Sequence, residues 1–367
     1  MKILTLLFTY NTSFEDWESN GSVDRELAIY TKLSKYFDKV YFITYGEKDK
    51  KYQKRLPSNI ILLPKKYPVP NSLYSLLIPF AYKRELKKSS WIKTNQIMGS
   101  WTAVLIKLFL IKKIAIRTGY TESLSLVSKN YLKKSLIWLI EFIAYKFSDT
   151  AIVTSKHQQD YLKKQYHLKN IHVIPNGIDT ELFKPINTTK NDSIVTNLLF
   201  IGRLHKEKNV INLIKSLKGI KRIKLLVIGN GHLQKEVLEL KNEYNINITL
   251  IDKVPNNTLP DVYTKADIYI QPSLYEGNPK TILEAMSCGL PVISTDVDGI
   301  NNVITHKQNG YLCQINSNSI RTAILSLRNN TKLKEKIGGN ARKYILENYN
   351  LDNILKKEIK LYKKYKS

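Results

Sequence analysis

Short apolar runs alternate with longer amphipathic stretches along most of the chain, and this rhythm constrains the fold more than any other feature. In the first half the runs lie at residues 3–8, 40–44, 60–63, 114–117, 151–154 and 172–174. They are nearly continuous in apolar residues, as expected for parallel strands that are covered on both faces. Stretches with helical spacing, such as 24–37 and 131–147, separate them. The alternation predicts an α/β fold with a parallel sheet.

A second series of apolar runs follows an Asn- and Thr-rich stretch at 184–197, which is typical of a linker. These runs lie at 198–201, 224–228, 248–251, 268–272 and 292–295. The chain has 367 residues, and domains commonly contain roughly 100–200 residues. We therefore predict one domain over 1–183 and a second over 184–349. A basic helix at about 350–367 is expected to cross back to the first domain.

The chain is strongly basic, with 58 Lys and Arg against 31 Asp and Glu and a net charge of +27. Such an excess indicates an acidic partner, which could be nucleic acid, anionic lipid headgroups or a phosphorylated substrate. An AT-biased genome is a competing explanation, because the chain is also rich in Asn, Ile and Tyr. Residues 82–91 and 130–138 combine Lys and Arg with aromatic side chains, which suits an anionic bilayer surface. We expect peripheral membrane contact through the more basic first half.

The cysteine content and the apolar runs indicate where such a protein works. Cys288 and Cys313 are the only cysteines, which favours a reduced compartment. The N-terminal apolar run is short and turns acidic at once, so we interpret it as a first strand and not as a signal peptide. No run reaches the roughly 18 apolar residues of a membrane-spanning helix. We expect a cytoplasmic protein on the inner face of the plasma membrane.

The segment 271–299, QPSLYEGNPKTILEAMSCGLPVISTDVDG, is the most informative for chemistry. It predicts a strand, a tight loop with Gly277 and Pro279, a helix and a second strand. A loop that feeds a helix N-terminus offers unpaired N–H groups and the positive end of the helix dipole to a phosphate. Glu276 and Glu284 flank the start of this helix, and carboxylates accept hydrogen bonds from sugar hydroxyls.

A second constellation lies at 200–209, FIGRLHKEKN, where a strand ends at Ile201, Gly202 turns the chain and basic residues lie close together in a short loop. Arg203 offers a planar fork to a phosphate, and Lys208 offers a point charge. Basic side chains at this place match the ligand-binding edge of an open α/β sheet.

Two other patterns are weaker. Asp296 and Asp298 spell a D-x-D, but they follow a strand inside the segment just described, and we expect no metal there. Residues 229–231, GNG, partly resemble a dinucleotide fingerprint, but the third glycine is missing. We therefore expect no nicotinamide cofactor and no other cofactor.

These blocks resemble the retaining glycosyltransferases of family 4. EGNPKTILE matches the E-x7-E signature of that family, and FIGRLHKEKN matches its Gly-Arg…Glu-Lys block. IPNGID at 174–179 is similar to the interdomain junction, and GLPVISTDVDGI at 289–300 to the block after the signature. The resemblance implies a GT-B fold, in which two Rossmann-like domains face each other across a cleft and the second domain binds a nucleotide-sugar.

The resemblance also implies roles for individual residues. Arg203 and Lys208 would stabilise the departing diphosphate, and Glu276 would contact the transferred sugar. Glu284 would bind the ribose hydroxyls, and Gly21 would belong to a glycine loop beside the diphosphate. The implied donor-binding set is Gly21, Gly202, Gly277, Asn278, Pro279, Lys280, Thr281 and Glu284. On the acceptor side, the residues after a strand are Arg117, Gly119 and Tyr120.

The sequence thus predicts a retaining, metal-independent hexosyltransferase that uses a nucleotide-diphospho-sugar as its substrate. The acceptor would be a hydroxyl of a saccharide or a lipid-linked saccharide in the synthesis of a cell-surface polysaccharide or glycolipid. An epimerase of sugar nucleotides with the same fold is an alternative. A nucleic-acid-binding protein is a further alternative, but the chain contains no recognisable nucleic-acid module.

Overall fold

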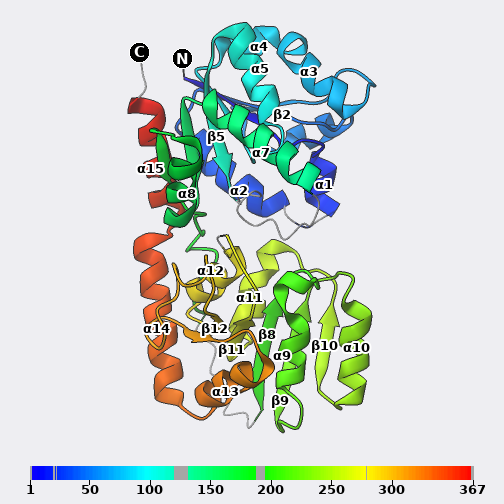
Figure 1. Cartoon of the computed structure of the whole chain (residues 1–367), viewed down its shortest axis with the longest axis vertical. Coiled ribbons are helices and arrows are strands. Elements are labelled where there is room, and N and C mark those ends of the chain that lie inside the picture. Colours follow the sequence, from blue (N-terminus) through cyan, green and yellow to red (C-terminus); the bar gives the residue numbers. More distant parts are fainter. Residues whose placement is uncertain are drawn as a thin grey trace. The chain divides into compact units, whose positions relative to one another are not determined.

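The computed structural model describes residues 2–19, 21, 23–119, 131–186, 195–277 and 279–364. The chain forms two compact units, one of Met1–Pro175 with Leu355–Ser367 and one of Asn176–Ile354. Each unit is built on one sheet of parallel strands that is covered by helices (Figure 1). The predicted α/β class with two parallel sheets is confirmed.

The sheet of the first unit has seven strands in the order β3-β2-β1-β4-β5-β6-β7. All of its neighbouring strands pair in parallel, and every residue of β1 is buried. The strands are β1 (Ile3–Leu7), β2 (Lys39–Ile43), β3 (Ile60–Leu63), β4 (Trp91–Thr94), β5 (Lys113–Thr118), β6 (Thr150–Val153) and β7 (Ile171–Val173). The helices are α1 (Phe14–Ser19), α2 (Val23–Ser34), α3 (Asn71–Ala81), α4 (Lys83–Lys88), α5 (Ser100–Leu110), α7 (Tyr131–Lys146) and α8 (Lys156–Tyr166), with a 3-10 helix at Asp49–Arg55.

Strand β4 lies at the centre of this sheet, and the sequence did not indicate it. It pairs with β1 on one side and with β5 on the other. Its sequence WIKT places Lys93 in the middle of a short run, which hides the apolar character of the strand. The basic aromatic stretch over 82–91 does not present its rings to solvent, because Tyr82 is buried before α4 and Trp91 is buried in β4.

The sheet of the second unit has six parallel strands in the order β10-β9-β8-β11-β12-β13. The strands are β8 (Thr196–Ile201), β9 (Ile223–Ile228), β10 (Ile248–Ile251), β11 (Ile268–Gln271), β12 (Val292–Thr295) and β13 (Tyr311–Cys313). The helices are α9 (Val210–Ser216), α10 (Gln234–Glu243), α11 (Leu259–Thr264), α12 (Lys280–Ser287), α13 (Ser317–Arg328) and α14 (Thr331–Asn348), with 3-10 turns at Lys206–Lys208 and Asn256–Thr258. Strand β13, which has three residues, was not predicted either.

The two units meet along the chain at Pro175 and Asn176, earlier than the division we expected at 183. Residues 176–183 belong to the second unit because Ile178 and Phe183 are buried in its core. Ile178 also forms a parallel bridge with Asn350, at the end of α14. Residues 187–194 of the predicted linker lie outside the described part of the chain.

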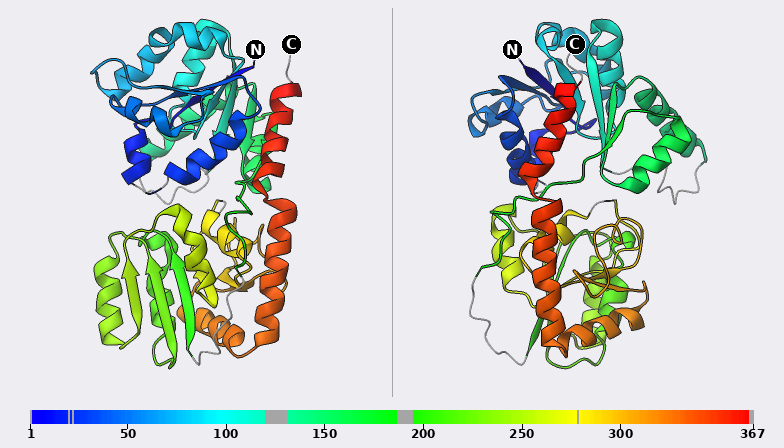
Figure 2. Two further views of the ribbon diagram at one scale, coloured as in Figure 1. Left: turned by 180° about the vertical axis from the view of Figure 1, so that it is seen from behind. Right: turned by 90° about the vertical axis from the view of Figure 1, so that its left-hand side faces the viewer.

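The C-terminal helix α15 (Leu351–Lys364) returns to the first unit from Leu355 onward, as expected (Figure 2). A buried ion pair anchors it there: Lys93 Nζ of β4 lies 2.5 Å from Glu358 Oε1, and the two side chains are 2% and 3% exposed. The Tyr362 hydroxyl donates to the same carboxylate at 2.7 Å, and the ring of Tyr362 packs on Trp91. Arg117 adds a second cation, with 3.9 Å between its Nη1 and Glu358 Oε2.

Burial and the neighbouring charges shift the pKa of Glu358 in opposite directions. Burial alone would raise the pKa of Glu358, but the charges of Lys93 and Arg117 and the hydrogen bonds from Lys93 and Tyr362 outweigh it, so the pKa of Glu358 is lowered. Glu358 is therefore ionised at neutral pH and serves as the counter-ion of a lysine inside the protein.

Candidate functional site

The second sheet has a topological switch point between β8 and β11. These strands are parallel neighbours at its centre, with β9 and β10 on one side and β12 and β13 on the other. Ligands of open α/β sheets bind outside the carboxyl ends of the strands at such a point. The loop from Gly202 to Lys208 follows β8, and the loop from Pro272 to Pro279 follows β11. Both predicted constellations therefore flank the switch point.

Gly229 and Gly231, which follow strand β9, pack against the backbone of the first of these loops. Gly229 has a φ of +144°, and a Cβ atom there would lie 2.0 Å from the carbonyl oxygen of Gly202. Gly231 has a φ of +154°, and its Cβ would lie 2.5 Å from the carbonyl oxygen of Leu204. The GNG segment thus supports the backbone of the basic loop, a packing role that a side chain would abolish.

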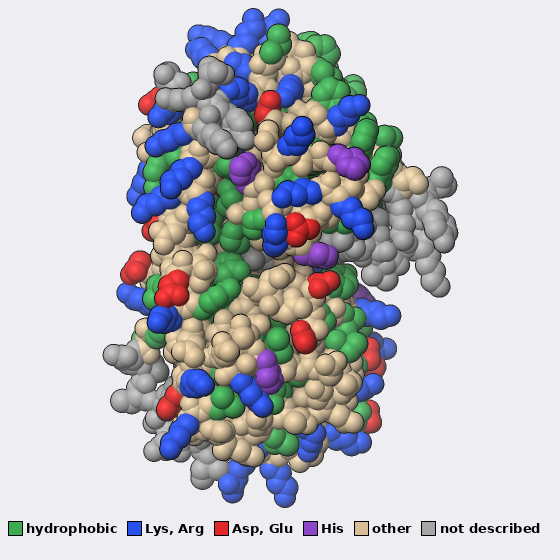
Figure 3. Space-filling model, turned by 60° about the vertical axis from the view of Figure 1, so that its left-hand side comes forward, with side chains coloured by type: hydrophobic (Ala, Val, Ile, Leu, Met, Phe, Trp, Pro, Cys, Tyr) green, Lys and Arg blue, Asp and Glu red, His purple; other side chains and the backbone are tan. Residues whose placement is uncertain are grey.

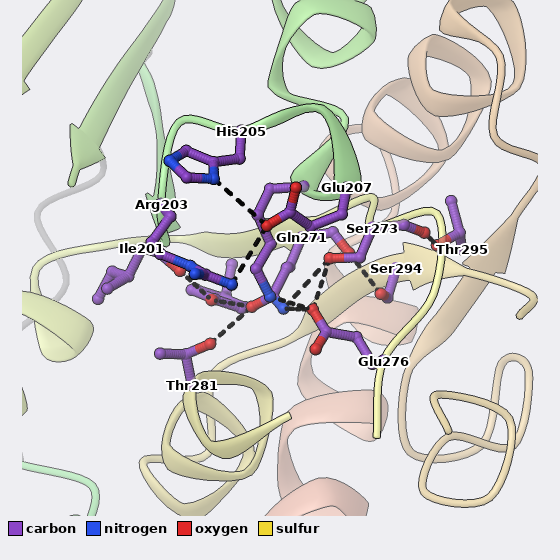
Figure 4. Close-up of polar contacts among 12 residues, drawn as sticks. Ile201, Arg203, His205, Glu207, Gln271, Ser273, Glu276, Thr281, Ser294 and Thr295 are labelled. Carbon is purple, nitrogen blue, oxygen red and sulfur yellow. Dashed lines mark hydrogen bonds and ion pairs between the residues drawn. The ribbon is translucent and has the colours of Figure 1, made fainter. Parts of the chain in front are cut away.

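Lys208 and Glu276 meet between the two loops. Oε1 of Glu276 accepts three hydrogen bonds, from Lys208 Nζ at 2.5 Å, from Gln271 Nε2 at 2.6 Å and from Ser273 Oγ at 2.7 Å. Figure 4 shows Gln271 and Ser273 beside this carboxylate. The side chains of Lys208 and Glu276 are 16% and 11% exposed, so both still reach solvent. Within the described part of the chain, Oε2 of Glu276 accepts no hydrogen bond. A bound molecule could donate to that oxygen and accept from the ammonium group.

Gln271, the last residue of β11, connects this carboxylate to the helix that follows. Its buried side chain donates to Glu276, while its Oε1 accepts hydrogen bonds from the hydroxyls of Tyr269 and Thr281, both at 2.6 Å. Thr281 lies in the first turn of α12. We did not single out Gln271 or Ser273 from the sequence, although both lie in the segment that we considered most informative. The one available signal was their place at the carboxyl end of a predicted strand.

The backbone of the Glu276 loop is held against the loop that follows β12. The Glu276 N–H donates to the carbonyl oxygen of Asp298 at 3.3 Å. Gly299 has a φ of +85°, and a Cβ atom there would lie 1.9 Å from the carbonyl oxygen of Glu276. Only glycine fits this position, so close packing explains the second glycine of the GLPVISTDVDGI block, Gly299.

Helix α12 begins beside this network. Pro279 precedes it and is buried, and no side chain caps the helix N-terminus among the described residues. The first N–H groups of the helix are therefore open to an anion. Gly277 and Lys280 border this helix start, whereas Asn278 lies outside the residues that the structure describes.

Arg203 comes from the same loop as Lys208 but has a different environment. Its side chain is 68% exposed, and its Nη2 lies 3.2 Å from Glu207 Oε1. His205 Nδ1 lies 3.6 Å from the same oxygen. Glu207 is tied to the second loop through its backbone, because its carbonyl oxygen accepts from the N–H of Leu274 at 2.8 Å. Arg203 is thus at the open side of the site, where a ligand can reach it.

Glu284, which we expected at a ribose, is almost fully buried in α12. Its Oε2 accepts a hydrogen bond from the Tyr263 hydroxyl at 3.0 Å, and Tyr263 is fully buried as well. Burial, followed by the charge of Glu284, raises the pKa of Tyr263 well above its usual value, so the tyrosine remains a hydrogen-bond donor. In this structure Glu284 braces α11 and α12 against each other.

The residues expected on the acceptor side belong to the first unit. Arg117 is turned toward Glu358 and is only 13% exposed, so it contributes to the anchor of α15. The N–H of Gly119 donates to Gln96 Oε1 at 2.9 Å. Gly21 has a φ of +67°, and no atom lies within 4 Å of the Cβ that could be built on it. Tyr120 lies outside the described residues.

Two negative findings concern the described residues alone. They contain no group of three or more His, Cys, Asp or Glu side chains arranged to hold a metal ion. Within the same ranges, no helix combines the length and the apolar character that a membrane crossing requires.

Comparison with known proteins identifies relatives for both halves of the chain. Residues 180–344 match the model of "Glycosyl transferases group 1", and residues 28–182 match that of "Glycosyltransferase Family 4". An uncharacterized glycosyltransferase of Methanocaldococcus jannaschii is 30% identical, over 60% of this chain and 59% of that protein. The UDP-Gal:alpha-D-GlcNAc-diphosphoundecaprenol alpha-1,3-galactosyltransferase of Escherichia coli is 28% identical, over 58% of this chain and 59% of that protein. The chain therefore spans less than two thirds of the length of these curated relatives.

A solved structure covers more of the chain. Sucrose-phosphate synthase from Thermosynechococcus elongatus superimposes with a TM-score of 0.82 over 99% of each chain, at 18% sequence identity. At this level of identity the likeness concerns the fold, and it confirms the GT-B class that the sequence predicts.

Proposed function

We propose that this chain, a glycosyltransferase of group 1 type by the two family models that together match residues 28–344, transfers a sugar from a nucleotide-diphospho-sugar to a hydroxyl group. The acceptor would be a saccharide or a lipid-linked saccharide at the inner face of the plasma membrane. The name of the Escherichia coli relative supports this choice, because it specifies a UDP-sugar donor and an acceptor on a lipid diphosphate.

The observation that carries the proposal is the meeting of Lys208 and Glu276 beside the switch point of the second sheet. Breaking the bond between a sugar and a diphosphate builds negative charge on the diphosphate and positive charge on the sugar. A fixed ammonium group stabilises the first charge, and a fixed carboxylate stabilises the second. Two opposite charges held 2.5 Å apart can serve both ends of the bond that breaks.

This geometry supports the following proposed roles for individual residues. Lys208 binds the diphosphate together with the N-terminus of α12, and the exposed Arg203 closes on it from the open side. Oε2 of Glu276 accepts a hydrogen bond from a sugar hydroxyl. Gly202, Gly277 and Thr281 form the wall beside the donor. These cations take the place that a metal ion has in other transferases.

We also propose that the configuration of the transferred sugar is retained. In a front-face displacement, the acceptor hydroxyl attacks on the side from which the diphosphate departs. The departing phosphate oxygen takes the acceptor proton, so no separate base is required. Lys208 holds that oxygen in place. Holding the donor and the acceptor in one reactive geometry lowers much of the remaining barrier to transfer.

A panel of nucleotide-sugars in a thermal-shift assay identifies the donor, because a ligand that binds only the folded state raises the melting temperature. Transfer is then measured as release of the nucleoside diphosphate with saccharide acceptors present.

We expect Glu276→Ala and Arg203→Ala to lose transfer while their circular dichroism stays that of the parent chain. Unchanged turnover in both variants would refute the assignment. Conversion of the sugar without an acceptor would instead indicate an epimerase.

Gln271 should act as a positioning residue for Glu276. Replacing it by methionine removes its hydrogen bond to the Glu276 carboxylate, and bonds to charged groups contribute about 1.5–3 kcal/mol. The substitution also removes the oxygen that accepts from the hydroxyls of Tyr269 and Thr281. We expect Gln271→Met to lower kcat by roughly ten- to a hundredfold with little change in the KM of the donor, because the orientation of Glu276 matters most in the transition state.

Ser294→Ala is the matched control for this variant. Ser294 is buried on the adjacent strand, and its hydroxyl donates only to the backbone oxygen of Gln271, at 2.5 Å. Its kcat should remain near that of the parent chain. Equal losses in both variants would mean that Gln271 matters for packing alone.

A further inference from the structure

Three neighbouring helices of the first unit present apolar side chains on their outer faces. Helix α5 packs between α3 and α7. On α3 the exposed residues Leu73, Leu76 and Phe80 recur at intervals of three and four. A helix at the surface of a globular protein normally carries polar side chains on that face. These helices bury one apolar face against the sheet and leave a second one uncovered.

The exposed residues form one surface, which we call the apolar face. On α5, Leu108 and Phe109 are each 57% exposed, and the ring of Phe109 packs against that of Phe80 with 5.2 Å between centroids. On α7, Leu136, Leu139 and Ile143 continue the pattern. Figure 3 shows hydrophobic side chains at the upper right edge of this unit, interspersed with Lys and Arg. Contiguous apolar surface of this kind marks an interaction site.

A basic pocket adjoins the apolar face where the strands of the first sheet begin. Its volume is about 450 Å³. Ile111, which follows α5 and is 91% exposed, lines the pocket and so joins it to the apolar face. The lysines that line it are Lys2, Lys88, Lys112, Lys113 and Lys363.

Two of these lysines lack a counter-ion among the described residues. Lys88 and Lys112 form no ion pair with any residue that the structure describes. Lys112 Nζ instead donates to the backbone oxygen of Lys87, and burial lowers the pKa of Lys112. The carboxylate of Asp38 accepts a hydrogen bond from the backbone N–H of Lys2 at the edge of the pocket. An anion in the pocket would satisfy these ammonium groups.

We propose that the apolar face and the basic pocket together dock the first unit on an anionic lipid bilayer. The apolar side chains would enter the boundary between headgroups and acyl chains, and the lysines of the pocket would bind a lipid phosphate. The juxtaposition of uncovered apolar side chains with Lys88 and Lys112, which form no ion pair with a described residue, favours a bilayer over a second copy of this chain, because a second copy would bring the same positive charges together. The proposal assigns a surface to the membrane location proposed above.

Vesicle binding tests this proposal without any use of transfer activity, so its failure is distinct from a failure of the proposed function. The intact chain is sedimented with vesicles of phosphatidylcholine alone or with phosphatidylglycerol added. We expect binding to the anionic vesicles that weakens with salt but does not vanish, because the apolar part is insensitive to salt.

Two double variants test the two parts of the surface. Phe80→Ser with Leu108→Ser should lower the partition coefficient by roughly tenfold or more, since burying one such side chain is worth more than the free energy of a tenfold change. Lys88→Gln with Lys112→Gln should reduce binding to anionic vesicles and leave the weak binding to neutral ones unchanged. Circular dichroism checks that both variants fold.

Matched controls lie on the second unit, where Leu238 and Leu346 are 41% and 40% exposed. Leu238→Ser with Leu346→Ser, and Lys332→Gln with Lys336→Gln, should bind as the parent chain does. Equal losses in variants and controls, or no binding to anionic vesicles, would overturn the proposal. So would a dimer that Phe80→Ser dissociates. Stabilisation by inorganic phosphate in the absence of vesicle binding would make the pocket a site for a soluble anion and would overturn it as well.

Discussion

Replacing Lys208 by alanine is expected to lower the kcat of sugar transfer by roughly two to three orders of magnitude, the usual effect of losing one preorganised group that stabilises developing negative charge. Lys208 is the cation that contacts Glu276, and its side chain is held in a network that exists before any ligand binds. Its loss leaves Gln271 and Ser273 to hold the carboxylate, so the fold should persist. The measurement is the initial rate of nucleoside diphosphate release at saturating donor.

Lys206→Ala is the matched control, because Lys206 lies in the same 3-10 turn and is exposed. Both substitutions remove one positive charge from the same loop. If the two variants lost activity equally, the general positive potential of the loop would account for the effect, and a specific role of Lys208 would be refuted.

Glu358→Ala should destabilise the first unit by about 3–5 kcal/mol, because it leaves a buried lysine without its counter-ion. Lys93 is 2% exposed and has its ammonium group against this carboxylate. All four tryptophans, at positions 17, 91, 101 and 138, belong to the first unit, so tryptophan fluorescence in urea follows the unfolding of that unit. Lys357→Ala, an exposed neighbour on α15, should change the midpoint little.

Removing both charges separates the cost of an orphaned charge from the value of the pair. Lys93→Met with Glu358→Leu should recover most of the stability that the single variant loses, since apolar side chains of similar size can replace a buried ion pair. A double variant as unstable as Glu358→Ala would show that the ion pair itself holds α15 in place.

The same pair predicts a dependence on pH. The pKa of Glu358 is lower in the folded chain than in the unfolded one. Its contribution to stability is therefore complete above the ordinary pKa of glutamate, about 4.3, and is lost as the pH falls through the lower pKa of the folded state. The difference in unfolding free energy between the parent chain and Glu358→Gln should therefore become smaller as the pH falls below about 4.3. A constant difference would contradict the lowered pKa.

The sequence predicts most of the fold because parallel strands are apolar on both faces, and each predicted run coincides with a strand. The sequence pattern does not predict strand β4. Its Lys93 is buried because it pairs with Glu358 of helix α15, a contact that no local pattern reveals. The division between the two units after Pro175 is not predicted for a similar reason, because the burial of Phe183 depends on the core of the second unit.

The candidate site is predictable to a lesser extent. Gly202, Lys208 and Glu276 stand out by residue type and by their place after strands. Gln271 does not, because its importance comes from four hydrogen bonds that only the folded sheet brings together. Glu284 has the expected spacing, but its burial depends on the packing of Tyr263 from another helix.

The return of α15 to the first unit has a consequence for how this protein is made. The ribosome delivers Lys93 long before it delivers Glu358, which lies 265 residues further along the chain. During synthesis the first unit therefore lacks helix α15 and the carboxylate that neutralises Lys93 until the second unit has been translated. An excised fragment ending at Pro175 would inherit the same defect, and the remedy is to graft residues 355–367 back onto it through a flexible tether.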